Sequence, residues 1–249
     1  LSETEKDEQL IGLPIQYKVK NFTKNNLRII ENNWENIKKS LLTTVRLISR
    51  FGFNSKNVVA PLALLPIAFY LKKRGNTSFD TSSDSNDADA QVVIRKWFIF
   101  ATLKNAFGSS SDTTLSKLRD LLITYDSKMQ FPADALYKSL GIEPRLLDSE
   151  IEKILGYNYQ GRYTNLILSL LYPDRDWKDA VFHEDHIFPK SEFQVRLLKK
   201  RKYDDARVKS YLEKYNTIAN LQLLTESENL SKNATPFDDW IKTRDATFC

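Results

Sequence analysis

The chain has 249 residues, a formal net charge of +5 and 41% hydrophobic residues, which suffices for one large domain or two small ones with a true core. The mildly basic balance permits a polyanionic partner without establishing one. The single cysteine, Cys249, excludes a disulfide within the chain and a cysteine-based zinc site. The polar, acidic opening segment does not resemble a signal peptide, and the longest apolar stretch is too short to span a bilayer, so we expect a cytoplasmic location.

Helices are predicted for most of the first two-thirds of the chain. Apolar residues at steps of three and four, from Ile30 to Ile48, predict a helix over residues 25–51. Pro61 is well placed to start a second, buried helix that Gly75 ends, and Pro66 is a candidate for a kink within it. The acidic, serine-rich residues 75–89 predict a solvated connector or a subdomain break.

Further helices are predicted over residues 90–106, 114–125, 133–140, 148–155 and 162–171. The pattern changes near the C-terminus. From Val181 onward, short apolar runs such as residues 220–224 favour strands, and Thr225 with Glu228 has the spacing of a capping box that starts a helix. The expected fold class is therefore mainly α with a small embedded strand–strand–helix (ββα) motif. We expect a helical linker or scaffold region over residues 1–75, a helical subdomain over 76–175, and the motif with a basic helical insertion over 176–249.

Candidate catalytic residues cluster around the chain's two histidines. His186 is directly preceded by Asp185, and the asparagines Asn220 and Asn229 follow, nine residues apart. An imidazole titrates near neutral pH and accepts a proton from water, which makes His186 the candidate general base. Mg²⁺ prefers oxygen ligands and retains several water molecules. Asp185 and Asn229 are therefore candidate ligands of Mg²⁺ or Mn²⁺.

The phrases EDHIFPKS and NLQLLTESENLSKN resemble the metal motif of HNH, or His-Me finger, nucleases. A similar phrase occurs in the nuclease lobe of RNA-guided CRISPR effectors. The closer resemblance is to the C-terminal nuclease domain of the GmrSD family of type IV restriction enzymes, in which a helical region precedes a D-H-x-x-P motif. The phrase APLALLPIAFYLKKRG is similar to the segment that joins this domain to an N-terminal ParB-like domain. The resemblance is specific over residues 182–240 and loose elsewhere.

This resemblance implies an HNH-type endonuclease that hydrolyses phosphodiester bonds of DNA with Mg²⁺ or Mn²⁺. It further implies the effector domain of a prokaryotic defence or restriction system that acts on modified or foreign DNA. The expected partners are DNA and an N-terminal nucleotide-binding, ParB-like domain. The chain itself has seven glycines and no glycine-rich phosphate-binding motif, so we assign no nucleotide hydrolysis to it.

The central asparagine of the motif is expected to orient the catalytic ring. By resemblance this role falls to Asn220, a second catalytic candidate. The connection between the two halves of the motif is longer here than in compact members of the superfamily, so Asn216 and Asn233 remain competitors.

Adjacent strand residues point to opposite faces. Asp185 and His186 therefore need a bend or loop at the strand end to approach one phosphate, and the nearby Pro189 fits such an exit.

Several basic or imidazole side chains are candidate contacts to nucleic acid. Four lie in the run KKRK of the insertion between Glu192 and Tyr215, where acidic neighbours partly neutralise them. These side chains suit phosphate contacts, and they equally fit a solvated, charged helix face. The complete set of candidates is His183, Lys190, Lys199, Lys200, Arg201, Lys202 and Lys232.

Three other readings of the sequence compete with the nuclease. A zinc site on His183 and His186 lacks an evident third nitrogen or sulfur ligand. A catalytically silent DNA-binding or regulatory module on an HNH-like scaffold would leave Asp185, His186 and Asn229 without a purpose. A purely helical interaction protein would leave the C-terminal pattern to chance.

Overall fold

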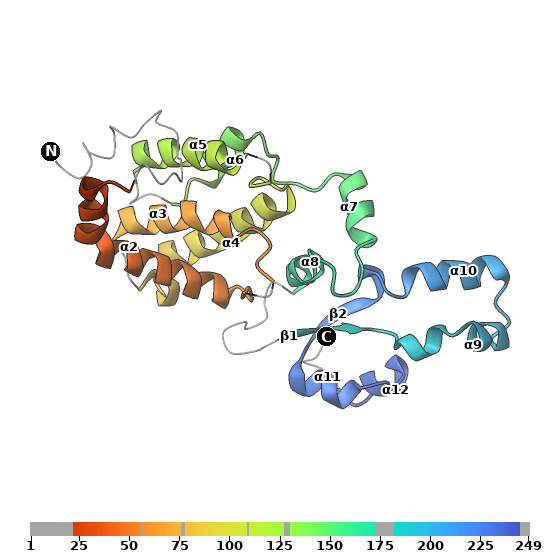
Figure 1. Ribbon diagram of the computed structural model, residues 1–249. Coiled ribbons are helices and arrows are strands. Elements are labelled where there is room, and N and C mark those ends of the chain that lie inside the picture. The colour runs from red at the N-terminus through yellow and green to blue at the C-terminus, as the bar shows by residue number, and fades with distance from the viewer. Residues whose placement is uncertain are drawn as a thin grey trace. The chain divides into compact units, whose positions relative to one another are not determined.

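The computed structural model describes residues 22–55, 57–75, 78–108, 110–126, 130–172 and 182–244. In that part of the chain the fold is mainly helical, with one two-stranded antiparallel sheet (Figure 1). This confirms the expected mainly α class. The chain divides into two compact units, Leu1–Arg145 and Leu146–Cys249. The expected domain boundaries differ from this division, because residues 75 and 175 each fall inside a unit.

The first unit is built from the helices predicted for it. Thr23 caps the first one, since its hydroxyl accepts a hydrogen bond from the Asn26 N–H at 3.2 Å. The core contains the fully buried side chain of Trp97, whose ring packs edge-on against Phe131 at a centroid distance of 5.5 Å. The elements in order are α2 (Lys24–Arg50), η2 (Pro61–Ala63), α3 (Leu64–Arg74), η3 (Phe79–Thr81), α4 (Ser85–Leu103), α5 (Ser111–Thr124) and α6 (Ala133–Leu140).

The helix expected to start at Pro61 begins there as a 3₁₀ turn and continues as α3. Pro66 is the third residue of α3. In the first turn of a helix the missing proline N–H removes little, so Pro66 does not interrupt α3. Gly75 ends the helix as predicted, with a φ of 72° that lies in the left-handed region available to glycine without a Cβ penalty.

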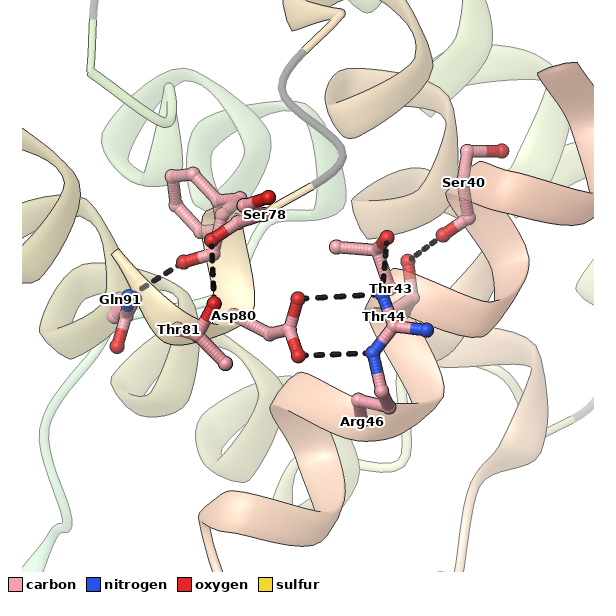
Figure 2. A network of polar contacts seen from close by, with 9 residues as sticks. Ser40, Thr43, Thr44, Arg46, Ser78, Asp80, Thr81 and Gln91 are labelled. Carbon is pink, nitrogen blue, oxygen red and sulfur yellow. Dashed lines mark hydrogen bonds and ion pairs between the residues drawn. The ribbon is translucent and has the colours of Figure 1, made fainter.

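The segment expected to be a solvated connector is partly packed. Phe79 is 0% exposed and Asp80 is 3% exposed. The Asp80 carboxylate accepts a hydrogen bond from Nε of Arg46 on α2 at 2.9 Å, and the Phe79 carbonyl accepts one from Gln91 of α4 at 2.7 Å (Figure 2). Asp84 then caps α4. Serine-rich composition predicted a connector, but a buried aromatic side chain and a buried carboxylate that pairs with the partly exposed Arg46 fix this segment against its neighbours.

The second unit contains the expected strand–strand–helix order. Strand β1 (Phe182–His186) pairs with β2 (Leu221–Thr225) in antiparallel fashion, and α11 (Glu226–Lys232) follows β2 directly (Figure 1). The elements in order are α7 (Asp148–Leu155), α8 (Thr164–Leu171), β1 (Phe182–His186), η4 (Lys190–Phe193), α9 (Val195–Lys200), α10 (Asp205–Lys214), η5 (Ile218–Asn220), β2 (Leu221–Thr225), α11 (Glu226–Lys232) and α12 (Phe237–Ile241).

The strand register determines what each face of the sheet carries. His186 pairs with Leu221, and Asp185 pairs with Gln222. Because side chains alternate between faces, His186 shares a face with Leu221 and Leu223, and these two leucines cluster with Leu168 of α8. Asp185 and Gln222 share the opposite face, where Asp185 contacts α11. The side chains of the consecutive residues Asp185 and His186 thus lie on opposite faces of the sheet.

The predicted capping box at the start of α11 is confirmed. The Thr225 N–H donates to Glu228 Oε2 at 2.7 Å, and the Glu228 N–H donates to Thr225 Oγ1 at 3.3 Å. Both bonds satisfy N–H groups that the helix itself leaves unpaired. The box starts α11 without an intervening loop and so fixes which residues of α11 face β1.

Among the described residues, no helix is both long enough and apolar enough to span a membrane.

Candidate functional site

The ring of His186 is oriented by an asparagine. His186 is the last residue of β1, and its Nε2 lies 3.0 Å from Oδ1 of Asn216. An amide oxygen only accepts hydrogen bonds, so Nε2 donates in this contact, and the lone pair of the neutral ring is then on Nδ1. The Tyr159 ring lies against the imidazole at a centroid distance of 4.8 Å, and the Tyr215 ring is nearly parallel to it at 6.4 Å. The ring is therefore held in one orientation with a known proton-accepting atom.

Of the three candidate asparagines, Asn216 is the one that contacts the histidine. Its backbone carbonyl also accepts a hydrogen bond from the Tyr159 N–H at 2.9 Å. One residue thus fixes both the ring and the aromatic side chain that covers it. Asn233, in contrast, caps the C-terminal end of α11.

The expected role of Asn220 has to be corrected. Its side chain is buried and bonds backbone groups on either side of the motif. Oδ1 accepts from the Phe188 N–H at 2.9 Å, and Nδ2 donates to the carbonyls of Phe188 at 3.0 Å and Tyr215 at 2.8 Å. The Asn220 carbonyl also accepts from the Ile187 N–H at 2.8 Å. Asn220 therefore fixes the backbone directly after His186, whereas the expected contact to the ring belongs to Asn216.

Asp185 lies in a charged contact on the other face of the strand. Its Oδ2 lies 2.8 Å from Nζ of Lys232 and accepts a hydrogen bond from Nε2 of Gln222 at 3.0 Å. Its Oδ1 has no protein partner among the described residues. The Asp185 side chain is 14% exposed. One carboxylate oxygen is thus anchored while the other is left to take a ligand.

Lys232 has a different environment from the one expected. It is 0% exposed, and its ammonium group also donates to the His186 carbonyl at 2.6 Å and lies 5.8 Å from the centre of the Trp240 ring. This burial argues against the predicted direct contact to nucleic acid. The physical reason is the position of Lys232 on α11, since it faces β1 and Asp185 attracts its charge.

Asn229 lies one helical turn before Lys232. Residues three apart share a helix face, and Lys232 reaches Asp185, so the face that carries Asn229 is directed toward β1. The Asn229 side chain is half-buried and forms no hydrogen bond within the described part of the chain. Adjacent elements thus contribute two hard oxygen atoms without protein partners, the Oδ1 atoms of Asp185 and Asn229.

The donor atoms fit a cation that retains most of its water. The described residues include no group of three or more histidine, cysteine, aspartate or glutamate side chains able to hold a metal. One carboxylate and one amide oxygen form a sparse shell of the kind Mg²⁺ accepts. A zinc site on His183 and His186 is disfavoured, because the two rings lie on opposite faces of β1.

Glu184 belongs to the site although no sequence motif indicated it. This residue shares the His186 face of β1, and its Oε2 accepts a hydrogen bond from the Gln160 N–H at 2.6 Å. Burial raises the pKa of the Glu184 carboxyl, and the hydrogen bond from Gln160 opposes that rise. Glu184 therefore tethers the segment that places Tyr159 over His186. Its position two residues before His186, on the same strand face, was the available signal.

The predicted nucleic-acid contacts other than Lys232 are exposed. Lys200 and Lys202 extend from the α9–α10 hairpin, which projects beyond the sheet in Figure 1. Lys199 forms an ion pair with Asp205, and Arg201 lies 3.0 Å from Glu192, so part of the charge of the run is neutralised. The exposed candidates are His183, Lys190, Lys199, Lys200, Arg201 and Lys202.

Comparison with protein-family models and with curated proteins finds no match to this chain.

Proposed function

We propose that this chain is a metal-dependent endonuclease of the HNH type that hydrolyses phosphodiester bonds of DNA. The observation that carries the proposal is the end of β1. There, a histidine with an oriented ring directly follows a carboxylate that has one unpaired oxygen. A proton acceptor next to a cation ligand is the combination that phosphodiester hydrolysis requires.

His186 acts as the general base. Its Nδ1 removes a proton from a water molecule as the water oxygen forms a bond to phosphorus. The bond from phosphorus to the 3′ oxygen breaks, and that oxygen takes a proton from solvent. The products are a 3′-hydroxyl and a 5′-phosphate. Asn216 accepts a hydrogen bond from Nε2–H and so directs Nδ1 of the neutral ring to act as the proton acceptor.

Asp185 and Asn229 would hold the cation through their Oδ1 atoms. When bound, a divalent cation supplies charge stabilisation at the phosphate and at the leaving oxygen. Asp185 and His186 lie on opposite faces of the sheet, but β1 ends at His186. A phosphate that crosses this strand end is reached from both faces. Asn220 fixes the turn that opens this end.

DNA binding is assigned to exposed cations. Lys200 and Lys202 contribute most, because neither is engaged in an ion pair within the described residues. His183 and Lys190 lie close in sequence to His186, so they contact the phosphates next to the one that reacts. Such contacts supply affinity without sequence preference.

The biological setting follows from the resemblance to the GmrSD family. We propose that the chain is the effector domain of a cytoplasmic prokaryotic defence system, that a ParB-like nucleotide-binding domain is its partner, and that modified or foreign DNA is its target. Cleavage of matched plasmids with and without cytosine modification tests the target preference separately from the chemistry.

A plasmid-cleavage assay tests the proposed activity. We expect nicked or linear product with Mg²⁺ or Mn²⁺ and none in EDTA, on plain or modified DNA. Absence of cleavage with either metal on both DNAs would overturn the proposal.

One observation favours a silent DNA-binding module as the second candidate. The Lys232 ammonium already neutralises Asp185, and within the described residues we assign only two protein oxygens to a cation, the Oδ1 atoms of Asp185 and Asn229. This candidate predicts that the chain binds DNA and never cleaves it. The same assay, combined with a gel-shift measurement, separates the two.

A further inference from the structure

We propose that Lys232 couples metal binding to nucleic-acid binding. Its ammonium neutralises Asp185, so a divalent cation binds tightly only after the substrate phosphate has added a negative charge. This inference rests on the proposed metal site and concerns its regulation.

The coupling depends on the fixed position of the ammonium group. Nζ lies 2.8 Å from Asp185 Oδ2 and 2.6 Å from the His186 carbonyl oxygen, and the Trp240 ring covers it at 5.8 Å. The Lys232 side chain is 1% exposed. An ammonium group that is buried and held by two oxygen atoms does not move readily into solvent. We therefore expect it to stay beside the carboxylate when a cation binds.

The charges of the site sum to zero. Asp185 contributes one negative charge, Asn229 contributes none, and Lys232 contributes one positive charge. The nearby Glu184 lies on the opposite face of β1 and bonds the Gln160 N–H. A divalent cation therefore meets a neutral ion pair, and an ion pair attracts a cation much more weakly than a lone carboxylate does, particularly in a partly buried site. A phosphodiester supplies the missing negative charge.

Thermodynamic linkage makes the effect reciprocal. If DNA increases the affinity for the cation, the cation increases the affinity for DNA by the same factor. The ion pair thus keeps the site weakly metallated until a phosphate occupies it. A merely structural lysine predicts something else, namely that its loss alters metal affinity equally with and without DNA.

Mn²⁺ binding measures this coupling without any turnover. The free Mn²⁺ signal in electron paramagnetic resonance is titrated with the full chain carrying His186→Ala, which keeps the duplex intact. The titration is made with and without a short DNA duplex, with a duplex-only blank subtracted. We expect the duplex to lower the Kd for Mn²⁺ by about tenfold, within the usual range of coupling between two sites.

The variant Lys232→Met, made in the same background, should bind Mn²⁺ roughly tenfold more tightly without DNA and lose most of the effect of the duplex. Lys242→Met is the matched control, because Lys242 is an exposed lysine of unit 2 that pairs with Asp239 at 3.5 Å. It should leave both Kd values unchanged. Lys232→Gln, which keeps a hydrogen-bond donor, replaces Lys232→Met if thermal unfolding shows that the latter is unfolded.

The possible outcomes separate the coupling from the metal site. If the protein that retains Lys232 binds Mn²⁺ equally well with and without duplex, the coupling is rejected and the metal site stands. The coupling is also rejected if the duplex lowers the Kd for Mn²⁺ by the same factor in folded Lys232→Met or Lys232→Gln as in the protein that retains Lys232. Absence of Mn²⁺ binding in both states would reject the metal site and the coupling together.

Discussion

Asp185 and His186 are consecutive in the chain, yet their side chains lie on opposite faces of the sheet and belong to separate networks. Asp185 contacts Gln222 and Lys232, whereas His186 contacts Asn216 and Tyr159. The proposed cation ligand is thus held by β2 and α11, and the proposed general base is held by loop segments on the other face. The Lys232 ammonium joins the two networks, because it also donates to the His186 carbonyl at 2.6 Å. Substitutions of Asn216 or Asn229, which do not contact Lys232, should leave the other network largely intact.

The first prediction concerns Asn216. Asn216→Ala removes the hydrogen-bond partner of the His186 ring, so the imidazole can rotate and change tautomer. We expect single-turnover cleavage to fall by about 10²-fold, the contribution of a positioned general base, while the urea unfolding midpoint changes little. The backbone bond to the Tyr159 N–H does not need the asparagine side chain. An unchanged cleavage rate would show that Asn216 does not position the ring.

Asn220→Ala should behave in the opposite way. It leaves the Phe188 N–H and the partly buried carbonyls of Phe188 and Tyr215 without their side-chain partner. We expect a loss of about 3 kcal/mol in the free energy of unfolding, because buried polar groups without partners are costly. Urea unfolding measures it. Wild-type stability of Asn220→Ala would contradict the assigned role of this residue in fixing the turn after His186.

The two proposed metal ligands should also be separable. Asp185→Asn removes the only negative charge of the protein shell and leaves the buried Lys232 ammonium uncompensated. We expect loss of cleavage that Mn²⁺ rescues poorly, together with a destabilisation of about 3 kcal/mol, as when one partner of a buried ion pair is removed. Thermal unfolding and cleavage titrated against Mg²⁺ and Mn²⁺ measure both effects.

Asn229→Ala removes a neutral oxygen and no ion pair. We expect lost cleavage in Mg²⁺, partial rescue at high Mn²⁺, and unfolding close to that of the wild type, since Mn²⁺ binds mixed sites at least as well as Mg²⁺ does. Full activity of either ligand variant at low metal concentration would reject a cation site built on Asp185 and Asn229.

The basic hairpin can be tested by the salt dependence of binding. Lys200→Gln combined with Lys202→Gln should lower the slope of log Kd against log salt by roughly 1.8 for duplex DNA, about 0.9 for each lost phosphate contact. Replacing Lys199 and Arg201 should lower it less, because each of these is already in an ion pair. The matched control replaces the exposed pair Lys38 and Lys39 of α2. Equal slopes for the wild type and the Lys200–Lys202 variant would mean that the hairpin is only a solvated surface.

The elements and the motif order could be predicted from sequence, whereas the contacts within the site could not. Apolar spacing located the helices, and the Thr225–Glu228 spacing located the start of α11, because both patterns are local. The choice between Asn216 and Asn220 depends on how the chain between β1 and β2 folds back, which local patterns do not contain. Lys232 was misjudged for a similar reason. Its charge suggested solvent or phosphate, and only the packing of α11 on β1 brings it to Asp185.

The connector prediction for residues 75–89 illustrates the same limit. Composition there indicated exposure, but the burial of Phe79 and the pairing of Asp80 with Arg46 across the fold depend on partners distant in sequence. The unit boundary near residue 145 likewise has no composition change to mark it.

The most direct test of the central claim is single-turnover cleavage of duplex DNA by the wild type and by His186→Ala, in Mg²⁺ and in EDTA, with DNA binding measured in parallel. We predict that the wild type cleaves only with metal and that His186→Ala loses at least about 10²-fold in rate. Its affinity for DNA should stay near that of the wild type, because phosphate affinity comes from cations elsewhere. Undiminished cleavage by His186→Ala, or wild-type cleavage in EDTA, would contradict the account.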